Sequence, residues 1–301
     1  QSLTRDGGAL AIAQRERPRL GIGHGNVEID MAAADARHVA LDAPGRFPGI
    51  SASTGPVDMP GLIAGKDELV EGMRSEKYVD LIEDYGWDLR QGDATFTGDA
   101  QDPVLEITNT DGAVETVRAR HYLVATGSTP WAPPVDGLEE VDYLTSTTAM
   151  ELQEVPESLI VLGGGYVALE QAQLFARLGS RVTVLVRSRL LSKEEPEVSK
   201  TLLGVFADEG IQVVRRAAVE SVATDPATGG VMVAATTGAG RQEYTAARLL
   251  VTTGRRAVTE GLGLETVGIE TDKRGYIVVD DQLRTSAAHI WAMGDCNGRG
   301  A

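Results

Sequence analysis

The chain has 301 residues, of which 42% are hydrophobic, and it carries a formal net charge of −16 with a sequence pI near 4.7. This length and apolar content allow two domains with buried cores, whereas the acidic charge argues against nucleic-acid binding because we find no local basic patch to oppose the repulsion. No run approaches the about 18 consecutive apolar residues of a membrane span, and the amino-terminal residues do not resemble a signal sequence, so we expect a cytoplasmic protein.

The first segment, residues 1–39, shows no recognisable motif. Residues 1–50 are rich in Arg, Gly and Ala without sustained apolar periodicity, and the glycine cluster at 21–25 follows no apolar strand, which argues against a phosphate-binding loop. Farther along, the range Pro60–Tyr85 places apolar residues at roughly helical spacing among charged ones. We predict a long amphipathic helix there.

Two segments of the chain repeat one pattern. Residues 104–127 and 231–254 each read as a β-hairpin followed by an apolar strand that ends in Thr-Gly. In the first copy the pair Asp111-Gly112 is a two-residue turn signal. Tandem copies of one nucleotide-binding architecture explain the repeat economically.

The stretch between the two copies alternates strands and helices. We predict a strand at Ser158–Leu162, a helix that ends at Leu178 before Gly179, and a strand at Arg181–Val186. A helix over residues 197–209 and a strand over residues 211–214 follow. Such alternation predicts a parallel sheet with helices packed on it, and the closely spaced prolines of residues 131–137 predict a linker.

The most informative motif is GGGYVALE, which follows the strand and opens the helix. Gly163 permits a tight turn, Gly165 lets the backbone approach a pyrophosphate, and Ala168 allows close packing of helix against strand. The helix amino terminus then offers N–H groups to the phosphates. The alternative is a purely structural glycine turn, but the strand–turn–helix–strand context favours dinucleotide binding.

The end of the next strand indicates which dinucleotide binds. A site for NAD requires a carboxylate there to bind the ribose 2′-hydroxyl, and Val186 occupies that position. Arg187, Arg189 and Lys193 follow, and cationic donors suit the 2′-phosphate of NADPH. The alternative is that these are solvated charges at the end of a strand.

The last informative segment is TSAAHIWAMGDC, in which an apolar strand, Ile290–Met293, ends in Gly294-Asp295. This places one carboxylate at the carboxyl edge of a sheet, where ligands bind in open α/β folds. Taken alone, the same residues fit a surface turn.

Together these motifs resemble the pyridine nucleotide–disulfide oxidoreductases, in which LVATGSTP, GGGYVALE, LVTTGRR and MGDC occur in this order. The stretches RFPGIS, DELVEGMRSEKYVDL, YLTSTTAMEL and LEQAQLFARLGSRVTVL are similar to mercuric reductases within that family. The resemblance implies two Rossmann-like α/β domains, each a doubly wound parallel sheet with a β-hairpin layer. It implies FAD and NADPH as cofactors, and hydride transfer from NADPH to FAD followed by reduction of Hg(II), held as a thiol complex, to Hg(0).

The resemblance also implies roles for individual residues. Tyr166 would cover the flavin and swing aside for the nicotinamide, and Glu170 would lie close to the flavin and orient a lysine. The implied NADPH-binding residues are Gly163, Gly165, Ala168, Arg187, Lys193 and Gly254. The implied FAD-binding residues are Gly92, Ala94, Ala125, Thr126, Gly127, Gly294 and Asp295.

The sequence departs from the family in several places. The family's FAD fingerprint and redox cysteine pair belong upstream of residues 32–38, and its carboxy-terminal dimerisation domain belongs beyond Ala301. The chain shows neither, and Ala257-Val258 replaces the usual Pro-Asn. Cys296 is its one cysteine. We interpret Cys296 as a small buried residue in preference to a redox or mercury-binding thiol, because one thiol cannot form an intramolecular pair.

The expected organisation is an NADPH domain at 151–264 inserted in a truncated FAD domain at 40–150 and 265–301, preceded by the divergent segment 1–39. We expect an incomplete copy of a mercury-detoxifying, homodimeric flavoprotein, with no resident metal. Two alternatives stay open: another NADPH-linked flavin disulfide reductase, such as one that acts on glutathione, or a non-catalytic NADPH-binding remnant.

Overall fold

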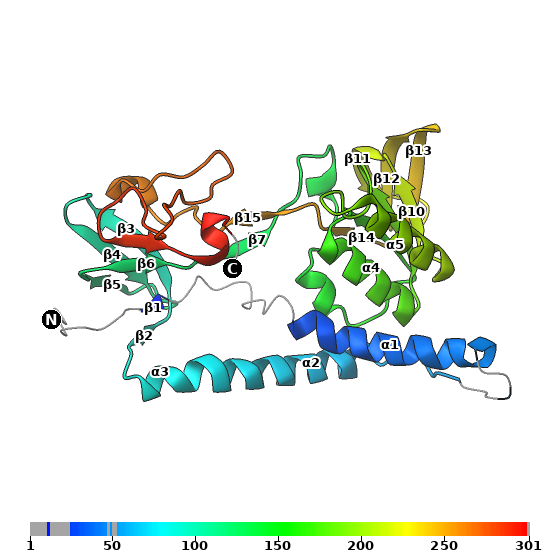
Figure 1. Ribbon diagram of the computed structural model, residues 1–301, viewed down its shortest axis with the longest axis horizontal. Coiled ribbons are helices and arrows are strands. Elements are labelled where there is room, and N and C mark those ends of the chain that lie inside the picture. The colour runs from blue at the N-terminus through cyan, green and yellow to red at the C-terminus, as the bar shows by residue number, and fades with distance from the viewer. Residues whose placement is uncertain (1–10, 13–24, 47–48, 50–52, 300–301) are drawn as a thin grey trace. The chain divides into compact units, whose positions relative to one another are not determined.

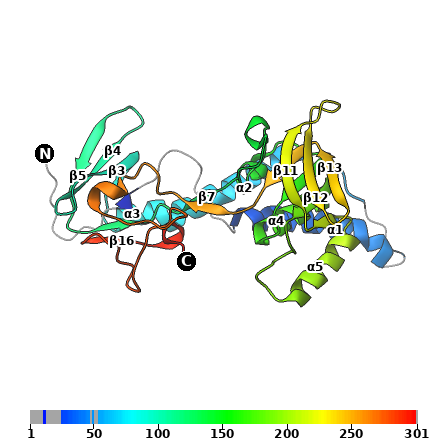
Figure 2. The ribbon, with the colours of Figure 1, turned by 90° about the horizontal axis from the view of Figure 1, so that it is seen from above.

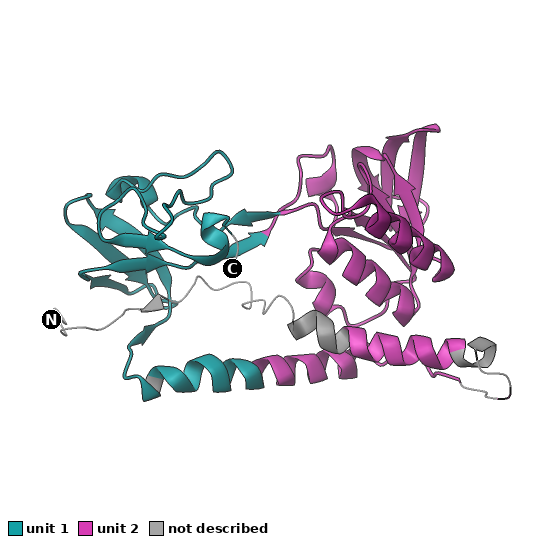
Figure 3. Cartoon of the chain, viewed as in Figure 1, with its two compact units in different colours: residues 1–20, 72–129, 255–301 teal, residues 21–71, 130–254 magenta. Residues whose placement is uncertain are grey.

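The computed structural model describes residues 11–12, 25–46, 49 and 53–299. The chain divides into two compact units (Figure 3). Unit 1 comprises residues 1–20, 72–129 and 255–301, and unit 2 comprises residues 21–71 and 130–254. Residues 130–150 therefore group with the glycine motif, and residues 255–264 group with the carboxy-terminal segment.

Unit 2 is built on a four-stranded parallel sheet in the order β10–β9–β8–β14. Figure 1 labels the edge strands β10 and β14, and Figure 2 shows the same unit from above. The predicted parallel sheet is thus confirmed, and the two central strands have the predicted bounds. The strands are β8 (Ser158–Leu162), β9 (Arg181–Val186), β10 (Gln212–Arg215) and β14 (Arg248–Val251).

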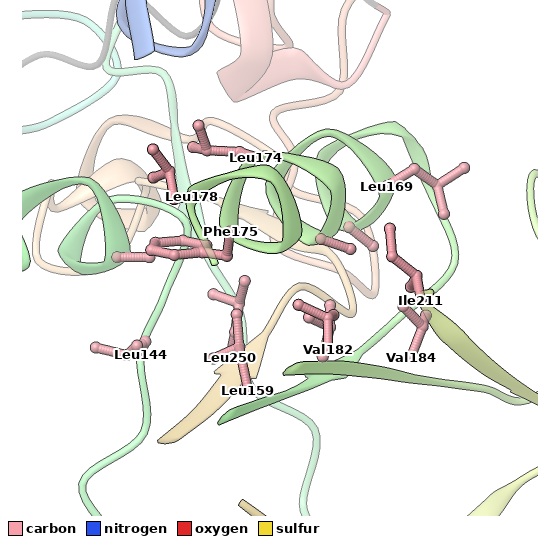
Figure 4. Packing of buried hydrophobic residues seen from close by; sticks show 14 of the residues in the cluster. Leu144, Leu159, Leu169, Leu174, Phe175, Leu178, Val182, Val184, Ile211 and Leu250 are labelled. Atoms are coloured by element: carbon pink, nitrogen blue, oxygen red, sulfur yellow. The ribbon is translucent and has the colours of Figure 1, made fainter. Parts of the chain in front are cut away.

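The sheet of unit 2 is covered on both faces, which explains the continuous apolar run of β8. Leu159 and Val161 belong to the core shared with helix α4 (Tyr166–Leu178), and Figure 4 shows Leu159 beneath Phe175 of this helix. Ile160 and Leu162 belong to a second core beneath an antiparallel sheet. Alternate side chains of a strand point to opposite faces, so both sets are buried. The covering sheet consists of β11 (Ala218–Thr224), β12 (Val231–Thr237) and β13 (Gly240–Ala246).

Helix α1 (Gly25–Arg46) packs against α4 and was not predicted. This segment lacks the apolar periodicity that indicates a helix, but it is rich in alanine, which favours helix through its intrinsic propensity. Arg177 of α4 joins the two helices through an ion pair with Asp35, and it also binds Glu209 at 2.6 Å. Glu209 directly follows helix α5 (Pro196–Asp208), close to the predicted position of that helix.

The predicted amphipathic helix is confirmed as a helical stretch from Met59 to Asp84. Its three parts are α2 (Met59–Arg74), the π-helical turn η1 (Ser75–Val79) and α3 (Asp80–Asp84). Met59 and Ile63 are buried, but Tyr78 and Leu81 farther along are exposed. The periodicity therefore predicted the helix correctly, and only its first part buries the apolar face.

Unit 1 contains the predicted hairpin of the first repeat, but its turn is longer than the predicted two residues, because the amide of Asn109 donates a hydrogen bond of 2.8 Å to the carbonyl of Ala113 across it. The unit also contains a parallel pair of strands. In the hairpin turn Gly112 adopts a φ of 83°. The core of the unit lies between the two sheets and contains Phe96 and Tyr122, whose rings are 5.4 Å apart. The antiparallel strands are β3 (Asp93–Gly98), β4 (Pro103–Thr108) and β5 (Val114–Val117); the parallel pair is β6 (Tyr122–Val124) and β16 (Ile290–Ala292).

Short elements complete the described residues. They are β1 (Ala11–Ile12), β2 (Leu89–Arg90), β7 (Ser128–Pro130), β15 (Arg255–Ala257) and the 3₁₀ turns η2 (Leu138–Glu140), η3 (Thr148–Glu151), η4 (Leu264–Val267) and η5 (Gly294–Asn297). The glycine cluster at 21–25 lies almost wholly outside the described residues. Of the helices that the structure describes, none combines the length and apolar character needed to cross a membrane.

Candidate functional site

The glycine motif forms the turn between β8 and α4 in unit 2. Gly163 has a φ of 138°, which side-chain-bearing residues rarely adopt, and a Cβ there would lie 2.7 Å from the carbonyl oxygen of Thr252. A Cβ on Gly164 would lie 2.4 Å from Cγ2 of Val186. These two glycines are therefore required by the packing of the turn against its neighbouring strands.

Gly165 differs from the other two glycines. Its backbone is extended, with φ −87° and ψ −179°, and a Cβ at this position would meet nothing within 4 Å. It precedes α4 without a side-chain cap, so the first N–H groups of the helix have no side-chain partner at this position. Ala168 is fully buried against the sheet. The open space before uncapped amides fits the phosphates of a dinucleotide.

The loop after β9 closes over the glycine turn. The amide of Leu191 donates a hydrogen bond of 2.7 Å to the carbonyl of Gly164. The guanidinium of Arg189 donates to the carbonyls of Glu194 at 2.6 Å and Ser192 at 3.0 Å. Arg189 therefore holds the loop in shape, which is a structural task that leaves its neighbour Arg187 free for a ligand.

A pocket of about 990 Å³ extends along β10 and reaches the loop after β9. Arg187 lines it, as a 2′-phosphate site requires, whereas the exposed Lys193 is not among its lining residues. Val186, which stands where a carboxylate would bind a ribose 2′-hydroxyl, is buried. The lining residues are Arg187, Ser188, Arg189, Ser192, Gln212, Val213, Val214, Arg215, Arg216, Thr237, Gly238, Gln242 and Tyr244.

Tyr166 is the first residue of α4, and its side chain is exposed. Its hydroxyl donates a hydrogen bond of 2.6 Å to Oε1 of Glu194, and this bond raises the pKa of Tyr166. Glu170, one turn farther along, is half-buried and forms no hydrogen bond or ion pair within the described residues. Tyr166 is thus tied to the loop after β9, and Glu170 keeps its carboxylate available.

Gly254 follows β14 at the same edge of the sheet as the glycine turn. Its φ of 155° lies at the limit of the region that favours glycine, and its carbonyl accepts a hydrogen bond of 3.0 Å from the amide of Trp131. Thr252, two residues earlier, contacts Gly163. The structure therefore brings most of the residues implied for NADPH to one edge of one sheet.

In unit 1, the residues implied for FAD follow β6 and β16. These strands are parallel neighbours, so Thr126-Gly127 and Gly294-Asp295 lie at one sheet edge. The hydroxyl of Ser128 donates to Oδ2 of Asp295 at 2.6 Å, and Nε of Arg255 is 3.9 Å from the same oxygen. Asp295 is half-exposed and keeps acceptor positions for a ligand hydroxyl, so this edge fits one side of a flavin nucleotide.

The other residues implied for FAD have different surroundings. Ala125 is exposed just beyond β6. Gly92 is buried against β4, where a Cβ would lie 2.5 Å from the carbonyl oxygen of Thr108. Ala94 is half-buried and packs against the core of unit 1. Close packing therefore accounts for Gly92 and Ala94 without a ligand.

Cys296 is fully buried, and its thiol approaches the carbonyl oxygens of Met293 at 3.1 Å and Val124 at 3.4 Å. Burial raises the pKa of this thiol. A buried, protonated thiol is a poor nucleophile and a poor metal ligand. This agrees with the interpretation of Cys296 as a small buried residue. Among the described residues, no group of three or more His, Cys, Asp or Glu side chains is arranged to hold a metal ion.

The sequence of residues 21–301 matches the family of pyridine nucleotide-disulphide oxidoreductases. The chain belongs to this family. It is 56% identical to a mercuric reductase of Streptomyces lividans over 88% of its own length, and 40% identical to one of Lysinibacillus sphaericus over the same share. These matches cover 55% and 46% of the two relatives, so the chain spans about half the length of the curated relatives it matches.

Solved structures agree with the family. The HOCl-induced flavoprotein disulfide reductase RclA from Escherichia coli superposes with a TM-score of 0.77 at 26% identity, over 92% of this chain and 57% of that one. LpdA from Mycobacterium tuberculosis superposes with a TM-score of 0.79 at 27% identity, over 92% and 58% of the two chains. The predicted α/β fold with Rossmann-type dinucleotide-binding domains is thereby confirmed.

Proposed function

We propose that this chain supplies the NADPH-binding domain and part of the FAD-binding domain of a flavoprotein oxidoreductase of the mercuric reductase type. The observation that carries the proposal is the glycine turn of unit 2. It leaves open space at Gly165 before the amides of α4, at the sheet edge where the pocket lined by Arg187 opens. A pyrophosphate fits the open space at Gly165, and a ribose 2′-phosphate fits the pocket.

Each residue of the NADPH site has one task in this proposal. Gly165 admits the pyrophosphate to the helix amides, and Arg187 pairs with the 2′-phosphate. NADH lacks the 2′-phosphate and so forms no ion pair with Arg187. Val186 cannot accept a hydrogen bond from the 2′-hydroxyl of NADH, so the loss of this ion pair is not compensated. Lys193 lies outside the pocket lining and contributes only a longer-range attraction.

The residues facing the flavin have positioning tasks. As the resemblance implies, Tyr166 would cover the flavin until the nicotinamide enters, and Glu170 would orient a lysine. Thr126 and Gly127 would line the adenine and pyrophosphate side of FAD, and Asp295 would hold its ribityl chain. The chemistry that the two cofactors supply when bound is hydride transfer from nicotinamide to flavin and a two-electron reduction of thiol-bound Hg(II) to Hg(0).

Mercury is the favoured substrate because the identity to mercuric reductases reaches 56%, against 26% to the flavoprotein disulfide reductase RclA. The other NADPH-linked flavin disulfide reductases, including those that act on glutathione, are the second candidate. The proposal includes homodimers and a cytoplasmic location.

Anaerobic mixing of the purified chain with FAD and NADPH tests this function. We expect saturable NADPH binding, and bleaching of the flavin that is faster with the chain than without it. A chain that binds neither nicotinamide dinucleotide would contradict the proposal. A chain that binds NADPH but does not accelerate flavin bleaching would restrict it to the non-catalytic NADPH-binding remnant.

A further inference from the structure

Arg187, Arg215 and Arg216 differ from the other arginines whose side chains the structure describes. Within the described part of the chain, only these three have side chains that form no hydrogen bond, ion pair or ring contact. The other described arginines each have at least one such interaction, as Arg181 binds Glu157 at 2.7 Å. All three unpartnered arginines line the same pocket at the carboxyl edge of the sheet of unit 2.

The strand topology brings these arginines together. Strand β10 runs parallel to β9, with Arg215 opposite Val186. The amide of Ala217 then donates a hydrogen bond of 3.1 Å to the carbonyl of Val186. Arg216 lies between these two pairing points, beside the strand end from which Arg187 extends. The three side chains therefore start from adjacent backbone positions on two neighbouring strands.

The backbone at Arg216 is strained. Its φ of 56° lies in the left-handed region, which residues with a bulky side chain rarely adopt. Strained backbone of this kind is concentrated at ligand-binding positions, where the surroundings hold a side chain in place. A glycine or asparagine would occupy the same turn without this strain, so the turn alone does not account for an arginine.

The charge of the pocket is opposite to that of the chain. The net charge is −16, yet no aspartate or glutamate is among the lining residues. Ser188 and Ser192 add neutral hydroxyl donors to the guanidinium groups. Clustered cations without carboxylate partners repel one another, and a doubly charged phosphate monoester removes this repulsion while accepting several hydrogen bonds.

We propose that Arg215 and Arg216 are specificity-determining residues that complete, with Arg187, the site for the ribose 2′-phosphate of NADPH. This inference rests on the proposed function and replaces Lys193 as the second cationic partner. It assigns discrimination between NADPH and NADH to two strand ends, whereas the sequence pattern had placed it on the loop after β9 alone.

Calorimetric titration of the full chain with 2′,5′-ADP and 5′-ADP tests the inference, because the two probes differ only in the 2′-phosphate. We expect Arg215→Gln and Arg216→Gln each to weaken 2′,5′-ADP about three- to tenfold, as for partly solvated charge-assisted contacts, and to leave 5′-ADP within about twofold. The matched control is Arg181→Gln, which removes the same charge at the opposite end of β9 and should change neither affinity.

Arg187→Gln separates the failure of this inference from the failure of the proposed function. If Arg187→Gln weakens 2′,5′-ADP and the two β10 variants do not, the NADPH site stands and the inference is overturned. If the parent chain binds both probes equally, the NADPH assignment itself fails. Thermal unfolding of each variant shows whether it is folded, and Arg215→Lys should retain most of the affinity because it keeps the charge.

Discussion

Gly165 provides a substitution that separates folding from dinucleotide binding. Its backbone angles suit any residue, and an added Cβ would meet nothing within 4 Å. The folded chain should therefore accept alanine or valine there. Because Gly165 is the N-cap of α4 and valine is a poorer N-cap than glycine, we expect Gly165→Val to lower the free energy of unfolding by only about 0.5–1 kcal/mol.

The same substitution should abolish most of the binding energy. A pyrophosphate must approach the amides of α4 through the space that the valine side chain would fill. Each charge-assisted hydrogen bond contributes about 1.5–3 kcal/mol, so the loss of two such bonds weakens NADPH at least about 100-fold.

Two other glycines serve as matched controls. Gly164→Ala places a Cβ 2.4 Å from Cγ2 of Val186 and should destabilise the chain by about 1–3 kcal/mol through overpacking. Gly204→Ala lies in α5 with open space around it and should stabilise the chain by about 0.5–1 kcal/mol without a change in affinity. Denaturant unfolding and NADPH calorimetry measure both effects. If Gly165→Val binds NADPH as tightly as the parent chain does, the dinucleotide lies elsewhere.

Three further predictions concern stability and turnover. Burial opposes the ionisation of Glu209, but its bonds to Arg177 outweigh this effect and lower its pKa. Urea unfolding near neutral pH should therefore show the parent chain to be about 1–3 kcal/mol more stable than Glu209→Gln. This difference in stability should vanish as the pH falls through the lowered pKa of Glu209. A difference independent of pH would contradict this. Arg216→Gly should raise the free energy of unfolding by up to about 1 kcal/mol, because it relieves a φ of 56°, and an unchanged melting temperature would argue against strain. The 301-residue chain holds one cysteine, which is buried, so we expect no Hg(II)-dependent NADPH consumption in excess thiol, and robust turnover would give Cys296 a role that its burial argues against.

Local signals predicted the central part of unit 2 with its correct bounds. The apolar run at Ser158–Leu162 is buried on both faces, so its composition alone marks a central strand. Gly179 ends helix α4 with a φ of 120°, a left-handed conformation that favours glycine. The hairpin at Asp111-Gly112 is a local turn signal of the same kind.

Features that depend on tertiary contacts were not predictable from the sequence. Helix α1 lacks apolar periodicity, and its position depends on Arg177 of a distant helix. Arg215 and Arg216 lie close to Arg187 because of the parallel register of β9 and β10, in which Arg215 is opposite Val186. The sequence does show two consecutive arginines, Arg215 and Arg216, directly after the strand predicted at residues 211–214. Their proximity to Arg187 can be seen only once β9 is known to be the neighbouring strand.

The preference for NADPH over NADH tests the central claim most directly. Calorimetry on the parent chain should show NADPH binding at least about tenfold more tightly, because one charge-assisted contact to the 2′-phosphate suffices for that ratio. In Arg187→Ala the preference should fall or disappear while NADH affinity stays the same. Equal affinities in the parent chain, or a preference that Arg187→Ala leaves unchanged, would contradict the assignment of this pocket to NADPH.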